Sequence, residues 1–84
     1  MSDKDNPYTP ISCTEHSNYE LFIMHRQRLH IAWKDPHNHH NIDTLLPIDL
    51  QTKDGEEFLV AQDRNGQEIR IRLDYITHCT PINK

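Results

Sequence analysis

The chain has 84 residues, of which 35% are hydrophobic and 26% charged, and its formal net charge is −4 with histidines neutral. This length allows one domain with a small core, and no apolar run approaches the roughly 18 residues that a membrane-spanning helix needs. The acidic balance disfavours direct binding to nucleic acid, whose phosphates usually meet a Lys/Arg patch, and favours a basic protein partner. Ordinary solvated surface charge explains the same balance and is the simpler interpretation of composition alone.

The ends of the chain indicate the compartment and carry both cysteines. Residues 1–10, MSDKDNPYTP, are polar and acidic, unlike a secretory signal peptide, so we expect a cytoplasmic protein. Pro7 and Pro10 keep the residues before them out of helical geometry, which predicts an extended lead-in. Cys13 and Cys79 lie near opposite ends of the sequence. In a reducing compartment, we expect two buried thiols there instead of a disulfide.

A short helix is predicted within residues 13–25. Two capping boxes, in which a hydroxyl and a carboxylate satisfy the first free amides of a helix, fit this segment: Ser12-x-x-Glu15 and Ser17-x-x-Glu20. Tyr19, Phe22 and Ile23 share one helical face, but the other apolar residues point elsewhere. Either a fully packed helix or an early switch into a strand explains that imperfect pattern.

The segments after the helix have the pattern of short strands joined by turns. RLHIAWK, residues 28–34, alternates between apolar and polar side chains and predicts a half-buried strand that ends at the turn KDPHNHHN. Residues 42–46 are predicted to form a second short strand before Pro47. Residues 50–57 are predicted to be a loop that turns at an Asp-Gly pair.

The last part of the chain predicts two further strands. EEFLVAQ, residues 56–62, is followed by a tight Asn65-Gly66 turn and a regular final strand over residues 67–77. Short strands linked by tight turns and preceded by one helix predict a mainly β fold. We expect a small antiparallel barrel over residues 27–77, capped by the helix, in a single domain of residues 1–84.

Three histidines gather in the turn WKDPHNHHN: His37, His39 and His40, beside Asp35. Zinc sites usually take spaced ligand pairs from two elements and orient each ligand through further hydrogen bonds. These histidines come from one flexible loop, with neither cysteine nearby in sequence. We therefore interpret the segment as a solvated surface turn and expect no metal site.

Catalytic patterns are missing from the sequence. With two glycines, the chain has no glycine-rich phosphate loop and no Gly-x-Ser-x-Gly elbow. Cys13 and His16 supply a thiol and a base, but their spacing at a helix start is a capping context, and such pairs normally meet through the fold. We expect no enzyme and no cofactor.

Four arginines and two aromatic residues are candidates for a nucleic-acid groove with stacked bases: Arg26, Arg28, Arg70, Arg72, Trp33 and Tyr75. The alternative is that the strand arginines face solvent and pair with Glu57, Glu68 and Asp74. The overall acidity of the chain favours this alternative.

Several blocks, taken in order, form a wider pattern: Tyr8-x-Pro10-Ile11-x-Cys13, Asn18-x-Glu20-Leu21, Lys34-Asp35 at a strand end, Glu57-Phe58-Leu59-Val60, and Gly66 followed by Arg72-Leu73-Asp74-x-Ile76-Thr77. Their order and spacing resemble the Rof family, also called YaeO, the Rho-binding antiterminators of bacteria. The resemblance covers nearly the whole chain, and its first and last blocks are the most specific.

The resemblance implies a small Sm-like antiparallel β-barrel preceded by an N-terminal α-helix. It also implies a function without catalysis. Rof proteins bind the N-terminal domain of the hexameric terminator Rho, occupy the primary site that would take pyrimidine-rich RNA, and so inhibit Rho-dependent termination. A carboxylate-bearing helix suits such a cationic site, because it can place negative charge where phosphates would lie. We expect a cytoplasmic protein that is monomeric when free.

The helix start and one turn between strands match the family's partner-binding segments. The residues implied to contact Rho are Glu15, His16, Ser17, Asn18, Tyr19, Glu20, Thr52, Lys53, Asp54 and Gly55. The chain departs from the family after the cysteine, where an acid-acid-Tyr-acid-Asn order is common and residues 14–17 are Thr-Glu-His-Ser. It also has an elongated histidine turn where the family's first hairpin turns through Asp-Gly.

Two other functions compete with this one. An Sm-like module that binds RNA directly predicts salt-sensitive binding to short RNA without any protein partner. A metal-dependent sensor that uses the histidine turn predicts stoichiometric metal, which is lost when His37, His39 and His40 are mutated.

Overall fold

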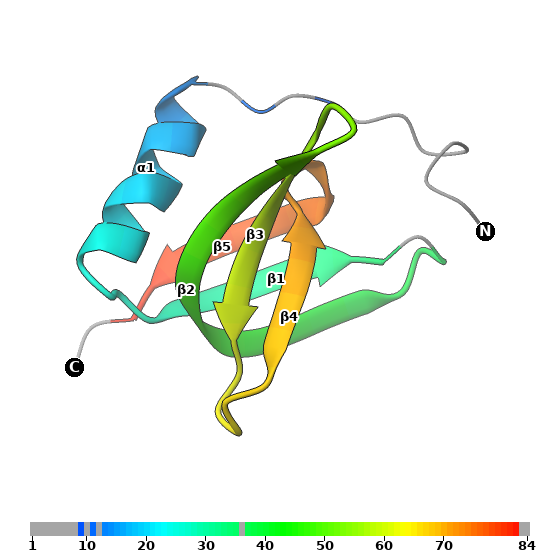
Figure 1. Ribbon diagram of the computed structural model, residues 1–84. Helices are drawn as coiled ribbons and strands as arrows, with labels where there is room; N and C mark the ends of the chain where they lie inside the picture. Colours follow the sequence, from blue (N-terminus) through cyan, green and yellow to red (C-terminus); the bar gives the residue numbers. More distant parts are fainter. Residues whose placement is uncertain (1–8, 10, 12, 36, 83–84) are drawn as a thin grey trace.

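A computed structural model describes residues 9, 11, 13–35 and 37–82. Within them, one helix precedes five strands, which form one antiparallel sheet in the order β4-β3-β2-β1-β5 (Figure 1). The fold is therefore mainly β with one helix, as expected. The sheet is not closed, because β4 and β5 are its two edges, and the predicted barrel is not confirmed. Most of the predicted lead-in lies outside the described residues.

The helix α1 spans Cys13–Met24, close to the predicted residues 13–25. Its inward apolar residues are Tyr19, Phe22 and Ile23, and its exposed ones are Leu21 and Met24. The imperfect apolar pattern thus belongs to a helix that packs along β2 with one face only. Among the described residues, no helix has the length and apolarity that crossing a membrane requires.

The carboxyl end of α1 is a Schellman motif. The amide of Gln27 donates to the carbonyl of Phe22, and the amide of Arg26 donates to the carbonyl of Ile23. Arg26 occupies the left-handed position of this motif, with φ 52°. At the other end, the second predicted capping box falls inside the helix, and the first begins at Ser12, outside the described residues.

The strand β2, His40–Lys53, is the longest element and corrects two predictions. It continues through Pro47, where a strand end was expected, and it includes residues 50–53, which were expected to be a loop. Its first half pairs with β1, Leu29–Lys34, and its second half pairs with β3, Glu56–Gln62. Pro47 is tolerated because it lies where β2 changes partner, beside a register shift that already interrupts the ladder.

The final predicted strand, residues 67–77, is in fact two strands. β4 spans Glu68–Arg72, a 3-10 turn η2 spans Leu73–Tyr75, and β5, Ile76–Pro81, then pairs with β1 at the far edge of the sheet. The regular alternation of the sequence hides this break. The side chain of Arg72, the last residue of β4, is buried and donates hydrogen bonds to Asp74 within η2.

The core lies inside the curved sheet, with α1 covering one side (Figure 1). Its buried residues are Tyr19, Leu29, Ile31, Leu45, Leu59, Ala61, Ile71 and Leu73. The two cysteines are free thiols: Cys79 is half-buried against this core, whereas Cys13 is exposed. The expectation of two buried thiols is therefore wrong for Cys13, because the first residue of α1 faces away from the sheet.

Candidate partner-binding surface

The predicted helix residues divide between the surface and the core. Glu15, Ser17, Asn18 and Glu20 are exposed, and the Glu20 side chain keeps 60% of its surface accessible. Tyr19 is 7% exposed and belongs to the core. This tyrosine therefore anchors α1 on the sheet, and the four polar residues around it are accessible to a partner.

His16 connects α1 to the sheet. Its Nε2 lies 3.3 Å from Oε2 of Glu57 on β3, and its Nδ1 lies 3.9 Å from Oε2 of Glu20. Both contacts become ion pairs when the imidazole is protonated. The side chains of His16 and Glu57 are 33% and 31% exposed, so solvent screens the attraction only in part. The imidazole of His16 thus lies between Glu20 of α1 and Glu57 of β3.

The second predicted segment, residues 52–55, comprises the last two residues of β2 and the tight two-residue turn to β3. All four residues are exposed, and Asp54 and Gly55 have φ 53° and 78°, as a two-residue hairpin turn requires. Thr52 pairs with Glu57, whose carboxylate contacts His16. The turn and the amino end of α1 consequently lie at the same end of the molecule (Figure 1). The fold brings the two predicted segments together.

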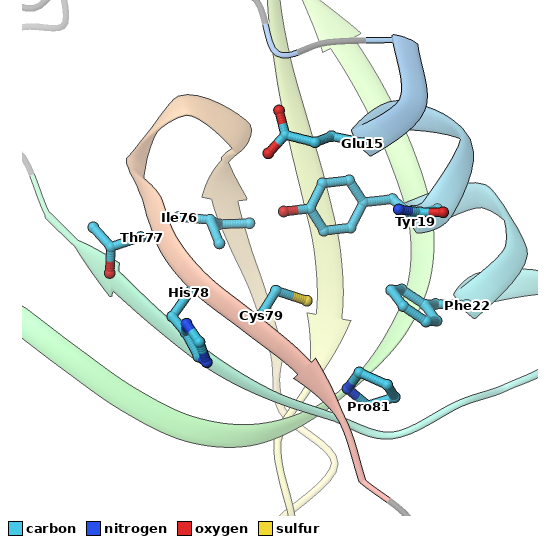
Figure 2. Close-up of a pocket in the computed structure, with 9 residues that line it drawn as sticks. Glu15, Tyr19, Phe22, Ile76, Thr77, His78, Cys79 and Pro81 are labelled. Atoms are coloured by element: carbon cyan, nitrogen blue, oxygen red, sulfur yellow. The ribbon is translucent and has the colours of Figure 1, made fainter.

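A groove of about 450 Å³ separates α1 from the edge strand β5 (Figure 2). Glu15, Tyr19 and Phe22 extend from α1 toward β5, and Cys79 extends from β5 toward the helix. Burial raises the pKa of the Cys79 thiol from 9.0 to about 11, so the thiol is neutral at physiological pH. The strand β5, which forms one wall of this groove, was not predicted from the sequence, although the β-branched residues within 76–82 were a signal for a further strand.

The four candidate arginines do not form one groove. Arg26 and Arg28 lie between α1 and β1, whereas Arg70 and Arg72 are on β4. Arg72 is 2% exposed: its Nε lies 2.7 Å from Oδ1 of Asp74, and its Nη1 lies 3.4 Å from Oε2 of Glu56. The hydrogen bonds that Arg72 donates to the Asp74 carboxylate raise the pKa of Arg72. The expected pairing with Asp74 is confirmed, and the expected exposure is wrong for Arg72.

The histidine turn is a surface feature. His37, His39 and His40 are exposed, and Oδ1 of Asp35 accepts the amides of His37 and His39. The hydrogen bond from the His39 amide is the main reason that the pKa of Asp35 lies below its usual value. In the part of the chain that the structure describes, no three His, Cys, Asp or Glu residues are arranged to hold a metal ion.

Comparison with known proteins adds a likeness in fold. Neither a family model nor a curated protein matches the sequence. Among solved structures, the fold is similar to part of proteasome accessory factor B/C (PafBC) of Arthrobacter aurescens, with a TM-score of 0.77 and 12% identity over 94% of this chain. The chain spans 13% of the length of that protein. At this identity the likeness concerns the fold of one part of PafBC, and it supports no activity.

Proposed function

We propose that this protein inhibits Rho-dependent transcription termination by binding the N-terminal domain of Rho and blocking its primary RNA-binding site. The proposal rests on the sequence blocks that resemble the Rof family. One structural observation supports it. The helix start and the 52–55 turn, which the resemblance assigns to Rho, lie at one end of the molecule and are joined by the contact of His16 with Glu57.

The exposed charge at this end suits the proposed partner. Glu15, Glu20 and Asp54 are exposed carboxylates on α1 and on the turn. A site that attracts RNA presents cationic groups that bind phosphates. Carboxylates on the surface of a helix can bind the same cationic groups in place of the phosphates. Because Tyr19 and Phe22 already fix α1 on the sheet, little conformational entropy is lost when the helix engages its partner.

The finer fold assignment is part of the same proposal. The five-stranded sheet with its amino-terminal helix is a variant of the Sm-like barrel, open between β4 and β5. The protein acts as a cytoplasmic monomer, and each copy occupies one protomer of the Rho hexamer. No chemical step is required, because occlusion alone excludes RNA.

The test is competition for Rho. Labelled oligo(dC) is bound to Rho, and its fluorescence anisotropy is followed while this protein is added. We expect a fall in anisotropy that Glu20→Lys abolishes, because the substitution reverses charge on the exposed helix face. Glu68→Lys is the matched control: it makes the same charge change on β4, at the edge of the sheet, and should leave displacement intact.

Two outcomes would overturn the proposal. If the wild-type protein displaces no oligonucleotide from Rho, occlusion of the primary site is wrong. If Glu20→Lys and Glu68→Lys weaken displacement equally, the net charge of the protein determines binding to Rho, and the exposed helix surface does not. The alternative function, an Sm-like module that acts on RNA directly, predicts no displacement from Rho together with binding of the oligonucleotide to this protein in the absence of Rho.

A further inference from the structure

A second hollow, of about 190 Å³, lies where the carboxyl end of β1 meets β3, β4 and η2. Its lining is unusual in this acidic chain, since it joins three aromatic rings to three cations. We call it the aromatic pocket, and its defining residues are Trp33, Phe58, Tyr75, Lys34, Arg70 and Arg72. The end of β1 lies on the opposite side of the view from α1 (Figure 1), so the aromatic pocket is separate from the helix part of the proposed Rho-binding surface.

The strand register explains why these residues converge. Phe58 on β3 stands opposite Arg72 on β4, and Arg70 is two residues away on the same face. The guanidinium of Arg70 lies 5.9 Å from the centre of the Phe58 ring. Trp33, Phe58 and Tyr75 are all half-buried, so each ring is held by packing and keeps part of its surface open.

Internal contacts already use some of the charges around the pocket. Arg72 is bonded to Asp74 and Glu56, and its guanidinium lies 4.2 Å from the centre of the Tyr75 ring. This cation therefore positions the ring. Asp35, which also lines the pocket, accepts the amides of His37 and His39 in the histidine turn. Lys34 and Arg70, in contrast, form no ion pair with any residue in the described ranges.

We propose that the aromatic pocket binds a base of single-stranded nucleic acid, with the neighbouring phosphates at Arg70 and Lys34. Preformed aromatic surfaces beside cations are the means by which proteins hold single strands with little sequence preference, since every base has a π face. The net charge of −4 opposes this binding at long range, so it is weak and local. Two phosphate contacts predict a slope of about −1.4 for log K against log salt, at about −0.7 per contact.

The experiment uses the protein alone, so its result is independent of Rho inhibition. Trp33 is the only tryptophan of the chain and lines the pocket, so its fluorescence reports directly on occupancy. Short oligo(rU) is titrated into the full chain at low salt. We expect saturable quenching, weakened on the order of fivefold by Arg70→Gln through loss of a phosphate contact and a cation–π contact.

Matched variants separate specific binding from general charge. Arg64→Gln makes the same charge change at an exposed position of the β3–β4 turn and should leave the affinity unchanged. Phe58→Leu keeps an apolar side chain but removes the ring, and it should weaken binding in a variant whose far-UV circular dichroism is native. Tripolyphosphate supplies charge without a base and should not reproduce the quenching.

Three results would overturn the proposal. These are the absence of saturable quenching by oligo(rU), an equal effect of Arg64→Gln and Arg70→Gln, and equal quenching by tripolyphosphate. Each result can occur whether or not the protein displaces oligonucleotide from Rho.

Discussion

Replacing Arg72 by methionine should destabilise the protein by about 3 kcal/mol. The change keeps an apolar stem of similar length but leaves Asp74 without the two bonds that it receives from Nε and Nη2, at 2.7 and 2.9 Å. The Asp74 side chain is 9% exposed, so water cannot replace these bonds fully. Removing one partner of a buried ion pair typically lowers the free energy of unfolding by about 3–5 kcal/mol. We expect the lower end of this range, because Asp74 still accepts a hydrogen bond from the backbone amide of Thr9.

The assay is urea unfolding, followed by Trp33 fluorescence and by far-UV circular dichroism. Arg70→Met is the control: it removes an arginine from the same strand at an exposed position and should cost about 0.5 kcal/mol or less. Adding Asp74→Asn to Arg72→Met removes the uncompensated charge and should recover about 1–2 kcal/mol. Two results would refute the conclusion that Asp74 in η2 is a buried carboxylate that depends on Arg72. One is a loss of less than about 1 kcal/mol in the free energy of unfolding for Arg72→Met, and the other is a double variant no more stable than the single one.

Four further predictions concern single groups. Arg26→Gly should raise the free energy of unfolding by about 0.5–1 kcal/mol in urea titrations, because Gly adopts φ 52° without strain; a loss of stability would contradict the Schellman assignment. At pH 8 iodoacetamide should modify the exposed Cys13 much faster than Cys79, whose pKa is about 11, and equal rates in the folded protein would be unexpected. Because the pKa of Cys79 is raised from 9.0, its stabilising effect is complete below pH 9 and is lost as the pH rises through 11, a decline that Cys79→Ala should reduce. The pKa of Asp35 is lowered from 3.8, so its contribution is present above that pH and is lost as the pH falls through the folded value; Asp35→Asn should flatten this acid limb of stability.

Local signals in the sequence predicted much of the fold. The wrong predictions concern segments whose structure depends on residues far away in the sequence. The helix, β1 and β3 followed from apolar pattern and turn residues. Pro47 suggested a strand end because a proline usually interrupts a ladder, but here β2 changes partner at that position. The alternation over residues 67–77 concealed η2, because the pattern of apolar and polar residues gives no sign of the buried contact between Arg72 and Asp74.

The candidate surface was predictable only in part, for a similar reason. The helix residues and the 52–55 turn came from the resemblance, but their meeting depends on the β2–β3 register that pairs Thr52 with Glu57. The burial of Tyr19 depends on how α1 packs, which an imperfect apolar pattern does not determine. The β5 wall of the groove and the aromatic pocket combine residues from several elements, and no local pattern marks such a combination.

The pairing of β5 with β1 has a consequence for the order of folding. Short turns join β1, β2, β3 and β4, and each of these strands pairs with the next one in the sequence. In contrast, β5 pairs with β1, the first strand in the sequence. Contacts between distant segments carry the larger loop-closure cost, so we expect β5 to dock after the rate-limiting barrier. Ile76→Val should then accelerate unfolding and leave the refolding rate nearly unchanged in stopped-flow experiments. A refolding rate that falls in step with stability would place β5 in the nucleus. With late docking, the groove beside α1 is among the last features that a newly made chain acquires.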